Sequence, residues 1–440
     1  MGLYLGRMAV VALFASTAAA QLSDYLGPGV TTYGAGQIGQ RSGQEVNLRF
    51  YADASGFYDS ALQAPSVNSQ GKLVQASGSG EELGFGAYGT YQWRHSQLGL
   101  DYRGVFRNYT TNTYYDGIDQ QIILGYTVQK SRRVYFDISA VGGTISRGIG
   151  ELAGYPIPIP TYIAQPASML FDNRTYYGQG QADMTYLVSA RTSFTVGGGG
   201  FVARRRSDAL AGVDGYVARG SIQRRFTRST TLGAAYEHVH FAYTQAFGDS
   251  DINNYEGFLG TQLGRRWTLS ARAGVFEAEA NGIQQVAVSP VISALLGITT
   301  TTEAFYTRHI FPSIDGSLTR VFKNANLSFA YAKTASPGNG VYLASRQENA
   351  WIVFSYTGLR KINFTFFGGG TRFNSFGQNL PSYWQANGGA GLTYSLTRAL
   401  HVTARYDARY ERIQASGYSP TAYRVTLGVA YSPGTLPLLR

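Results

Sequence analysis

The chain has 440 residues, no cysteine and a formal net charge of +11. The lack of cysteine excludes disulfides and thiolate metal sites. The excess of basic over acidic residues suggests anionic partners. Nucleic acid is a poor candidate, because the basic residues do not form a compact cluster in the sequence.

Residues 1–20 are typical of an export signal. Arg7 supplies a positive charge, residues 8–14 form an apolar core too short to span a bilayer, and three alanines at 18–20 offer a cleavage site. Residues 21–44 are rich in glycine and too short for a folded plug. We expect them to form a periplasmic N-terminal arm, either disordered or inserted into the lumen of the barrel that follows.

The rest of the chain alternates apolar and polar residues in successive segments. In residues 401–411 (HVTARYDARYE), alternate positions are apolar, and the positions between them are polar or charged. Strands point successive side chains to opposite faces. An apolar face rich in tyrosine and glycine, opposite a polar face, is expected where one face meets lipid and the other a water-filled lumen. No later stretch approaches roughly 18 consecutive apolar residues, which argues for strands rather than helices as the spans.

The turns predict an all-β fold, a transmembrane antiparallel up-and-down barrel of about 18 strands (16–18). The barrel would occupy residues 45–432, with a C-terminal tail at 433–440. Short basic turns are expected near residues 94–96, 130–133, 191–192, 227–229, 265–266, 323–324, 360–361 and 398–399. They alternate with longer loops near residues 54–80, 109–117, 148–174, 205–212, 244–251, 279–311, 334–346, 374–382 and 413–421.

The polar face supplies candidate lumen-lining residues. They are Arg49, Arg103, Arg107, Arg219, Arg225, Arg272, Arg405, Asp407, Arg409, Glu411 and Arg424. Further lumen-facing acids are expected at Asp53, Asp101, Asp137, Asp183, Glu256 and Asp315. Arginine rings favour anions. Much of the excess positive charge, however, lies in the short turns, so anion selectivity follows only weakly from the sequence.

Two of the longer loops are unusually apolar. Residues 152–170 are rich in proline and cannot pair as a central strand, and residues 283–298 are apolar enough to need burial. Each could fold into the lumen as a constriction, pack over the mouth of the barrel, or pack against a partner subunit.

No catalytic, cofactor-binding or metal-binding motif stands out, so we do not expect an enzyme. His238 and His240 have a spacing that can hold a metal, but Glu237, the nearest further ligand, should point to the opposite face. Two histidines near the rim of the barrel are the simpler interpretation. The glycine runs lie inside strand patterns and contain no phosphate-binding loop.

The export signal, the alternating strands and the terminal segment YRVTLGVAY (423–431) resemble bacterial outer-membrane porin-like barrels. The terminal segment is similar to the strand that the assembly machinery of such barrels recognises, with Gly428 and Tyr431 in suitable places, although SPGTLPLLR follows it. The tyrosine- and glycine-rich character and this tail are also similar to uncharacterised acidobacterial outer-membrane barrels. The resemblance implies the outer membrane of a Gram-negative bacterium, with its lipids and the barrel-assembly machinery as partners.

These observations predict a porin-like channel for passive diffusion of small hydrophilic solutes, with anions among the candidates. One alternative is a barrel that exports or anchors an extracellular polysaccharide. Another is a closed structural or adhesive barrel. The sequence leaves open whether the protein is a monomer or a trimer.

Overall fold

The computed structural model describes most of the chain after residue 47. The described residues are 48–61, 66–67, 69, 73–74, 77–110, 116–145, 174–208, 210–287, 300–338, 340, 343–376, 380–413, 421–433 and 435–436. The expected signal peptide, the N-terminal arm and the apolar loop at 152–170 lie outside these residues.

The described residues form strands, and no helix among them is long and apolar enough to cross a membrane. The long strands are β1 (Leu48–Asp59), β4 (Gly78–Gln92), β5 (Ser96–Tyr109), β6 (Gly117–Gln129), β7 (Val134–Ile145), β8 (Thr175–Leu187), β9 (Thr192–Arg205), β10 (Gly212–Arg225), β11 (Thr230–Thr244), β12 (Asp249–Leu263), β13 (Trp267–Ala287), β14 (Thr300–Val321), β15 (Ala325–Ser336), β16 (Ser345–Tyr356), β17 (Ile362–Ser375), β18 (Tyr383–Ser395), β19 (Leu400–Ile413) and β20 (Thr421–Tyr431). Three two-residue strands complete the set: β2 (Ser66–Val67), β3 (Leu73–Val74) and β21 (Thr435–Leu436).

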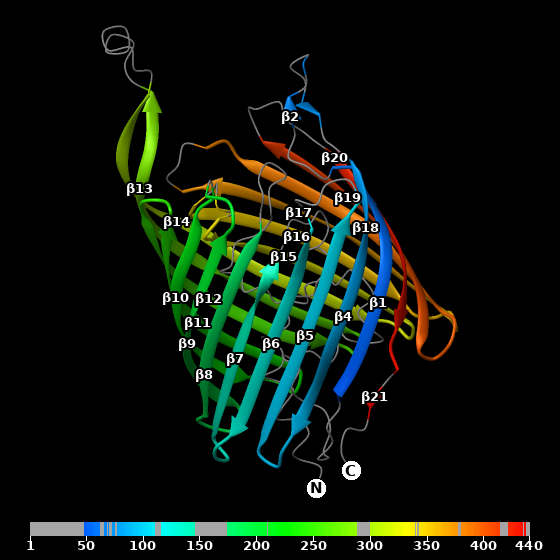
Figure 1. The fold of residues 1–440 in the computed structure, drawn as a ribbon. Helices are drawn as coiled ribbons and strands as arrows, with labels where there is room; N and C mark the ends of the chain where they lie inside the picture. Colours follow the sequence, from blue (N-terminus) through cyan, green and yellow to red (C-terminus); the bar gives the residue numbers. More distant parts are fainter. Residues whose placement is uncertain are drawn as a thin grey trace.

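The long strands form one closed antiparallel barrel (Figure 1). Each long strand pairs with its neighbours in the chain, and β1 closes the sheet by pairing with β20, from Ala52 opposite Tyr431 to Asp59 opposite Arg424. The short β21 pairs with the beginning of β1, and β2 pairs with β3 in a separate small hairpin. The predicted up-and-down barrel is therefore confirmed, with eighteen long strands.

The two faces of the barrel wall differ as the alternation predicts. Large apolar side chains such as Phe85, Ile138 and Leu427 point outward, and Leu427 is 61% exposed. The neighbouring positions point inward and are buried or half-buried, as the alternating burial along β20 shows. An exposed apolar outer face is stable where lipid covers it.

The eight predicted short turns all join consecutive strands, from β4–β5 to β18–β19. We refer to the end of the barrel that carries them as the short-turn end, and to the opposite end as the long-loop end. The turns form where basic and small polar residues interrupt the alternation, and serine or threonine hydroxyls accept backbone N–H groups in several of them, as in the turn at Ser131.

The prediction of a loop at residues 279–311 is wrong for most of these residues, which lie in strands. Strands β13 and β14 continue as a two-stranded ribbon beyond the barrel (Figure 1), with residues 288–299 outside the described residues. On its other edge β14 pairs with β15 only from Ile314 onward. The alternation in this ribbon is interrupted by Gly282 and by the adjacent Gln284 and Gln285, which is why the sequence pattern did not predict strands here.

Candidate functional site

Buried ionised side chains cover one side of the barrel interior. We call the inward side chains of β1, β4, β5, β6, β19 and β20 the charged wall. Glu82 lies at its centre, where its Oε1 accepts from Arg107 Nε at 2.5 Å and also pairs with Arg424. A second carboxylate, Asp119, accepts from Arg107 Nη1 at 3.1 Å. All four residues are buried, and Glu82 and Arg107 are each only 1% exposed.

Closure of the barrel brings this network together. Glu82 lies directly opposite Arg107 in the register of β4 with β5. Arg424 reaches Glu82 from β20, across β1, and its guanidinium lies 4.2 Å from the centre of the Phe57 ring on β1. The first and last strands of the barrel therefore both contribute to the cluster.

Other arginines of the charged wall pair along their own strands. Arg103 makes two bonds to Asp101, of 2.8 and 2.6 Å, and Arg405 approaches Asp407 at 2.7 Å. Residues two apart in a strand share a face, which is why this spacing forms pairs. Arg409 lies 3.5 Å from Glu411 in the same way.

The remaining candidate arginines lie in less crowded surroundings. Arg219 of β10 pairs with Asp183 of β8 across the intervening β9, and Arg272 lies 3.9 Å from Glu256. The Arg272 side chain is 34% exposed. Arg225 donates to the Ala190 carbonyl at 3.1 Å near a short turn, and Arg49 lies opposite Tyr88 on β4.

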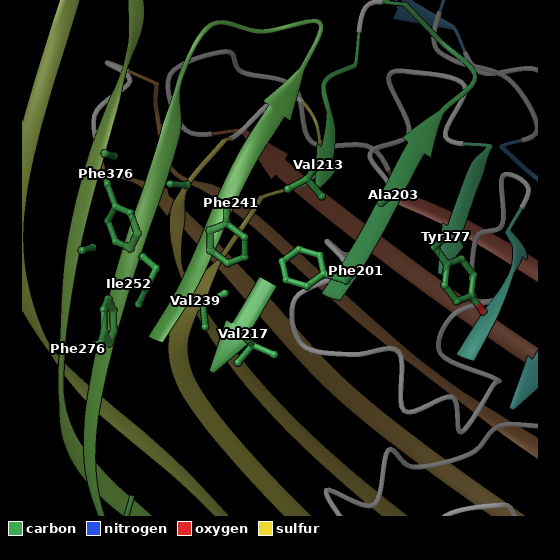
Figure 2. Close-up of a cluster of buried hydrophobic side chains, with 13 residues drawn as sticks. Tyr177, Phe201, Ala203, Val213, Val217, Val239, Phe241, Ile252, Phe276 and Phe376 are labelled. Atoms are coloured by element: carbon green, nitrogen blue, oxygen red, sulfur yellow. The ribbon is translucent and has the colours of Figure 1, made fainter. Parts of the chain in front are cut away.

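An apolar cluster covers another part of the interior, toward the long-loop end of β8 to β13. Figure 2 shows Phe201 and Phe241 beside each other in it, with ring centroids 5.8 Å apart. The buried cluster consists of Tyr177, Phe201, Ala203, Val213, Val217, Val239, Phe241, Ile252, Phe276, Ala278, Ala280, Ala344 and Phe376. This cluster was not predicted from the sequence, although the inward positions of β11 (Val239, Phe241) could have shown that this part of the interior is apolar.

Connections from distant strands pack against this apolar cluster. Phe376, which follows β17, stacks on Phe311 of β14 with ring centroids 5.3 Å apart. Gly340, between β15 and β16, accepts a hydrogen bond from the Ala211 N–H at 3.0 Å. This bond holds Gly340 beside the beginning of β10, where it also lies close to Arg205 and Leu210.

These features divide the interior into two parts. Toward the long-loop end, the charged wall is buried and the apolar cluster is covered by segments from other strands. Nearer the short-turn end, Arg219 and Arg272 keep side-chain exposures of 29% and 34%. Chemically, the interior offers paired charges beside an apolar surface, with its tightest packing at the long-loop end.

All eleven candidate lumen-lining residues lie on the inward positions of their strands. Whether they line an open aqueous passage stays a prediction. The candidates named from the sequence did not include Glu82 and Asp119, which pair with arginines at the centre of the charged wall. Extending the alternation one residue back from the outward Leu83 would have placed Glu82 on the inner face.

The two histidines with metal-like spacing lie on the outer face of β11. His240 Nδ1 is 2.9 Å from Asp251 Oδ1, and His238 Nδ1 is 3.0 Å from Asn253 Oδ1. The Tyr216 ring stacks on His240 with ring centroids 5.2 Å apart. Within the described residues, no group of three or more histidine, cysteine or acidic side chains could hold a metal.

No protein-family model matches the chain. No curated protein is significantly similar to it in sequence. Among solved structures, the fold is similar to OccK2 (OpdF) of Pseudomonas aeruginosa, at 10% identity and a TM-score of 0.42, covering 88% of this chain and 98% of that chain. It is also similar to a BenF-like porin from Pseudomonas fluorescens Pf-5, at 10% identity and a TM-score of 0.43, covering 89% of this chain and 100% of that chain. A third similar structure is Acinetobacter baumannii OccAB3, at 11% identity and a TM-score of 0.41, covering 88% of this chain and 98% of that chain.

Identities and TM-scores this low carry no conclusion about function. The expected acidobacterial resemblance finds no support among these structures. The function is therefore argued from the barrel itself.

Proposed function

We propose that this protein is an outer-membrane channel for passive diffusion of small hydrophilic solutes. The main support for the proposal is the polarity of the barrel wall, which is the reverse of that in a soluble protein: apolar side chains point outward and ionised side chains point inward. An exposed apolar outer face requires lipid, and ionised inner residues suit a water-filled interior. In this placement the short-turn end faces the periplasm and the long-loop end faces the outside.

The tight packing at the long-loop end supports a constriction there. A solute would pass between the charged wall and the apolar cluster, near Phe376 and Gly340. Solutes would then meet the more accessible part of the interior, around Arg219 and Arg272, nearer the periplasm.

The pairing of charges argues against strong ion selectivity. Five arginines of the charged wall have a carboxylate partner, so most of the wall offers a solute alternating charges rather than a positive track; they are Arg103, Arg107, Arg405, Arg409 and Arg424. This arrangement also gives no particular support to an acidic polysaccharide as the transported molecule. The closed structural barrel, in contrast, draws some support from the buried charged wall.

Conductance in a planar lipid bilayer tests the proposal. The refolded protein, shown to be folded by a heat-dependent shift in gel mobility, should give stable ohmic steps, and a salt gradient should give a reversal potential near zero. Silence from folded protein would reject the open channel in favour of the closed structural barrel. A strongly positive or negative reversal potential would reject the charge-paired interior as the determinant of selectivity.

A further inference from the structure

Exposed cations occupy every short turn of the barrel. All eight turns lie within the described residues, each contains at least one exposed arginine or lysine, and none contains a carboxylate. We call this set the basic collar: Arg94, Lys130, Arg132, Arg133, Arg191, Arg228, Arg265, Arg266, Lys323, Arg360, Lys361 and Arg398.

The outer face near the long-loop end has a different arrangement of charge. There several of the described cations lie beside carboxylates and pair with them. Arg308 pairs with Glu277 and lies 3.3 Å from Glu279, and Lys333 lies 3.4 Å from Glu348. Among the residues that the structure describes, the net positive charge is therefore concentrated at the short-turn end, where no described acidic side chain pairs with it.

Aromatic and aliphatic side chains lie directly beside the collar. Trp93 and Phe226 are exposed in the same turns as Arg94 and Arg228. Lys361 Nζ of the collar lies 6.0 Å from the centre of the Tyr394 ring. Cations with long side chains beside exposed rings suit the boundary between lipid tails and headgroups, because the ring enters the apolar layer and the cation stays in the polar one.

From this arrangement we infer that the basic collar binds the anionic phospholipid headgroups of the leaflet that faces the short turns. The attraction between a row of cations and an anionic lipid surface acts within a Debye length. A soluble polyanion would satisfy the cations but would leave the adjoining rings exposed to water, which is why a lipid surface fits better. The inference rests on the membrane placement proposed above, but it does not require an open pore.

Tryptophan fluorescence can test this locally, because the chain has only 4 Trp. Trp93 and Trp267 lie at the short-turn end, and the Arg320 guanidinium lies 4.8 Å from the centre of the Trp267 ring. A reporter variant, W351F/W384F, keeps these two as the only tryptophans. It would be folded into phosphatidylcholine vesicles that contain the same minor fraction of either brominated phosphatidylglycerol or brominated phosphatidylcholine, since bromine quenches tryptophan on contact.

The expected result is stronger quenching by brominated phosphatidylglycerol, corresponding to about a twofold or greater local enrichment. The excess should disappear in about 1 M salt, where the Debye length falls to about 3 Å. It should also fall in the collar variant R94Q/R265Q/R266Q/K323Q. The control R372Q/R412Q removes two exposed cations near the long-loop end and should keep the full excess, whereas the pair R265Q/R266Q, which removes the same number from the collar, should lower it.

Equal quenching by the two brominated lipids would overturn the inference, and so would an excess that survives in a collar variant shown to be folded by gel mobility. Binding of the detergent-solubilised protein to purified peptidoglycan, without any lipid excess, would instead assign the collar to a soluble polyanion and reject the lipid proposal. Conductance recorded on the same protein tests the proposed channel separately from the lipid binding. If the barrel does not conduct but is still quenched more strongly by brominated phosphatidylglycerol, only the channel proposal is rejected.

Discussion

Glu82 is the residue on which the charge balance of the interior depends. Replacing it with glutamine removes the carboxylate shared by Arg107 and Arg424 and adds one net positive charge to the cluster, in which Asp119 still pairs with Arg107. At about 8 Å in water-like surroundings, one unit charge changes the energy of an ion by about 0.5 kcal/mol, or about twofold in relative permeability. We expect the reversal potential of E82Q in a salt gradient to move toward anion selectivity by about this factor.

The neighbouring Glu81 provides the control, because it points to the outer face and is exposed. E81Q loses the same charge from the next position in the chain and should leave the reversal potential unchanged. If both variants shift selectivity equally, the charged wall does not determine which ions pass.

At this scale the sequence predicted the face of a side chain but not its partner. Alternation along one strand placed Arg103, Arg405 and Asp407 on the inner face, and their pairs are local. The bond between Glu82 and Arg424 joins residues 342 positions apart. It depends on the barrel closing with a particular register of β20 against β1, which no pattern within either strand determines.

Gly340 lies in the connection between β15 and β16, and its position should set the width of the passage. Gly340 has a φ of +91°, and a Cβ at this position would lie 2.6 Å from Arg205 Nε. G340V should therefore detach the segment from β10, raise the single-channel conductance, and cost about 1–3 kcal/mol of stability through backbone strain.

The control for this variant is G264V, in the short turn between β12 and β13. Gly264 also has a positive φ, of +71°, but a Cβ there would meet nothing within 4 Å. Both variants place a β-branched residue at a positive φ and so carry a similar backbone strain. Only G340V should also displace residues that face the interior. Unchanged conductance in G340V, with folded protein, would show that the segment does not narrow the passage.

Strand β7 offers adjacent residues that test which face meets lipid. Ile138 is an exposed outward residue near the middle of its strand, and Ser139 points inward. I138R should destabilise the barrel by about 2–4 kcal/mol, because it places a cation in the hydrocarbon layer. S139R should stay within about 1 kcal/mol of the unchanged protein. Urea unfolding in vesicles measures both, and equal losses would contradict the assignment of the faces.

Elements with regular alternation were predicted well, and those that depart from it were not. The short turns were found because a basic, polar break separates two alternating runs, as at residues 130–133. The ribbon of β13 and β14 was missed because its pairing continues through residues that alternate poorly. A loop near residues 334–346 was predicted, but the position of Gly340 within it was not, because that position depends on contacts with Arg205 and Ala211, which lie far away in the sequence.

At the scale of the barrel, the charges of the described residues differ from one region to another. Paired charges lie inside, mixed charges lie on the outer face near the long-loop end, and unneutralised cations lie in the short turns. The formal charge of +11 therefore does not describe the interior. The selectivity of a channel of this kind follows from the local pairing of inward residues.

Closure of the barrel is the property on which this arrangement depends, and truncation of the C-terminus tests it. Strand β20 pairs with β1 from Ala52 to Asp59, whereas β21 pairs only with Leu48 and Arg49. Removing residues 433–440 should leave the seam intact and preserve the heat-dependent gel shift and the conductance. Removing residues 424–440 takes away most of the partner of β1 together with Arg424. It should abolish both signals, because an open edge in lipid leaves backbone groups unpaired. A folded, conducting protein after the longer deletion would show that the seam between β20 and β1 is not what closes the barrel.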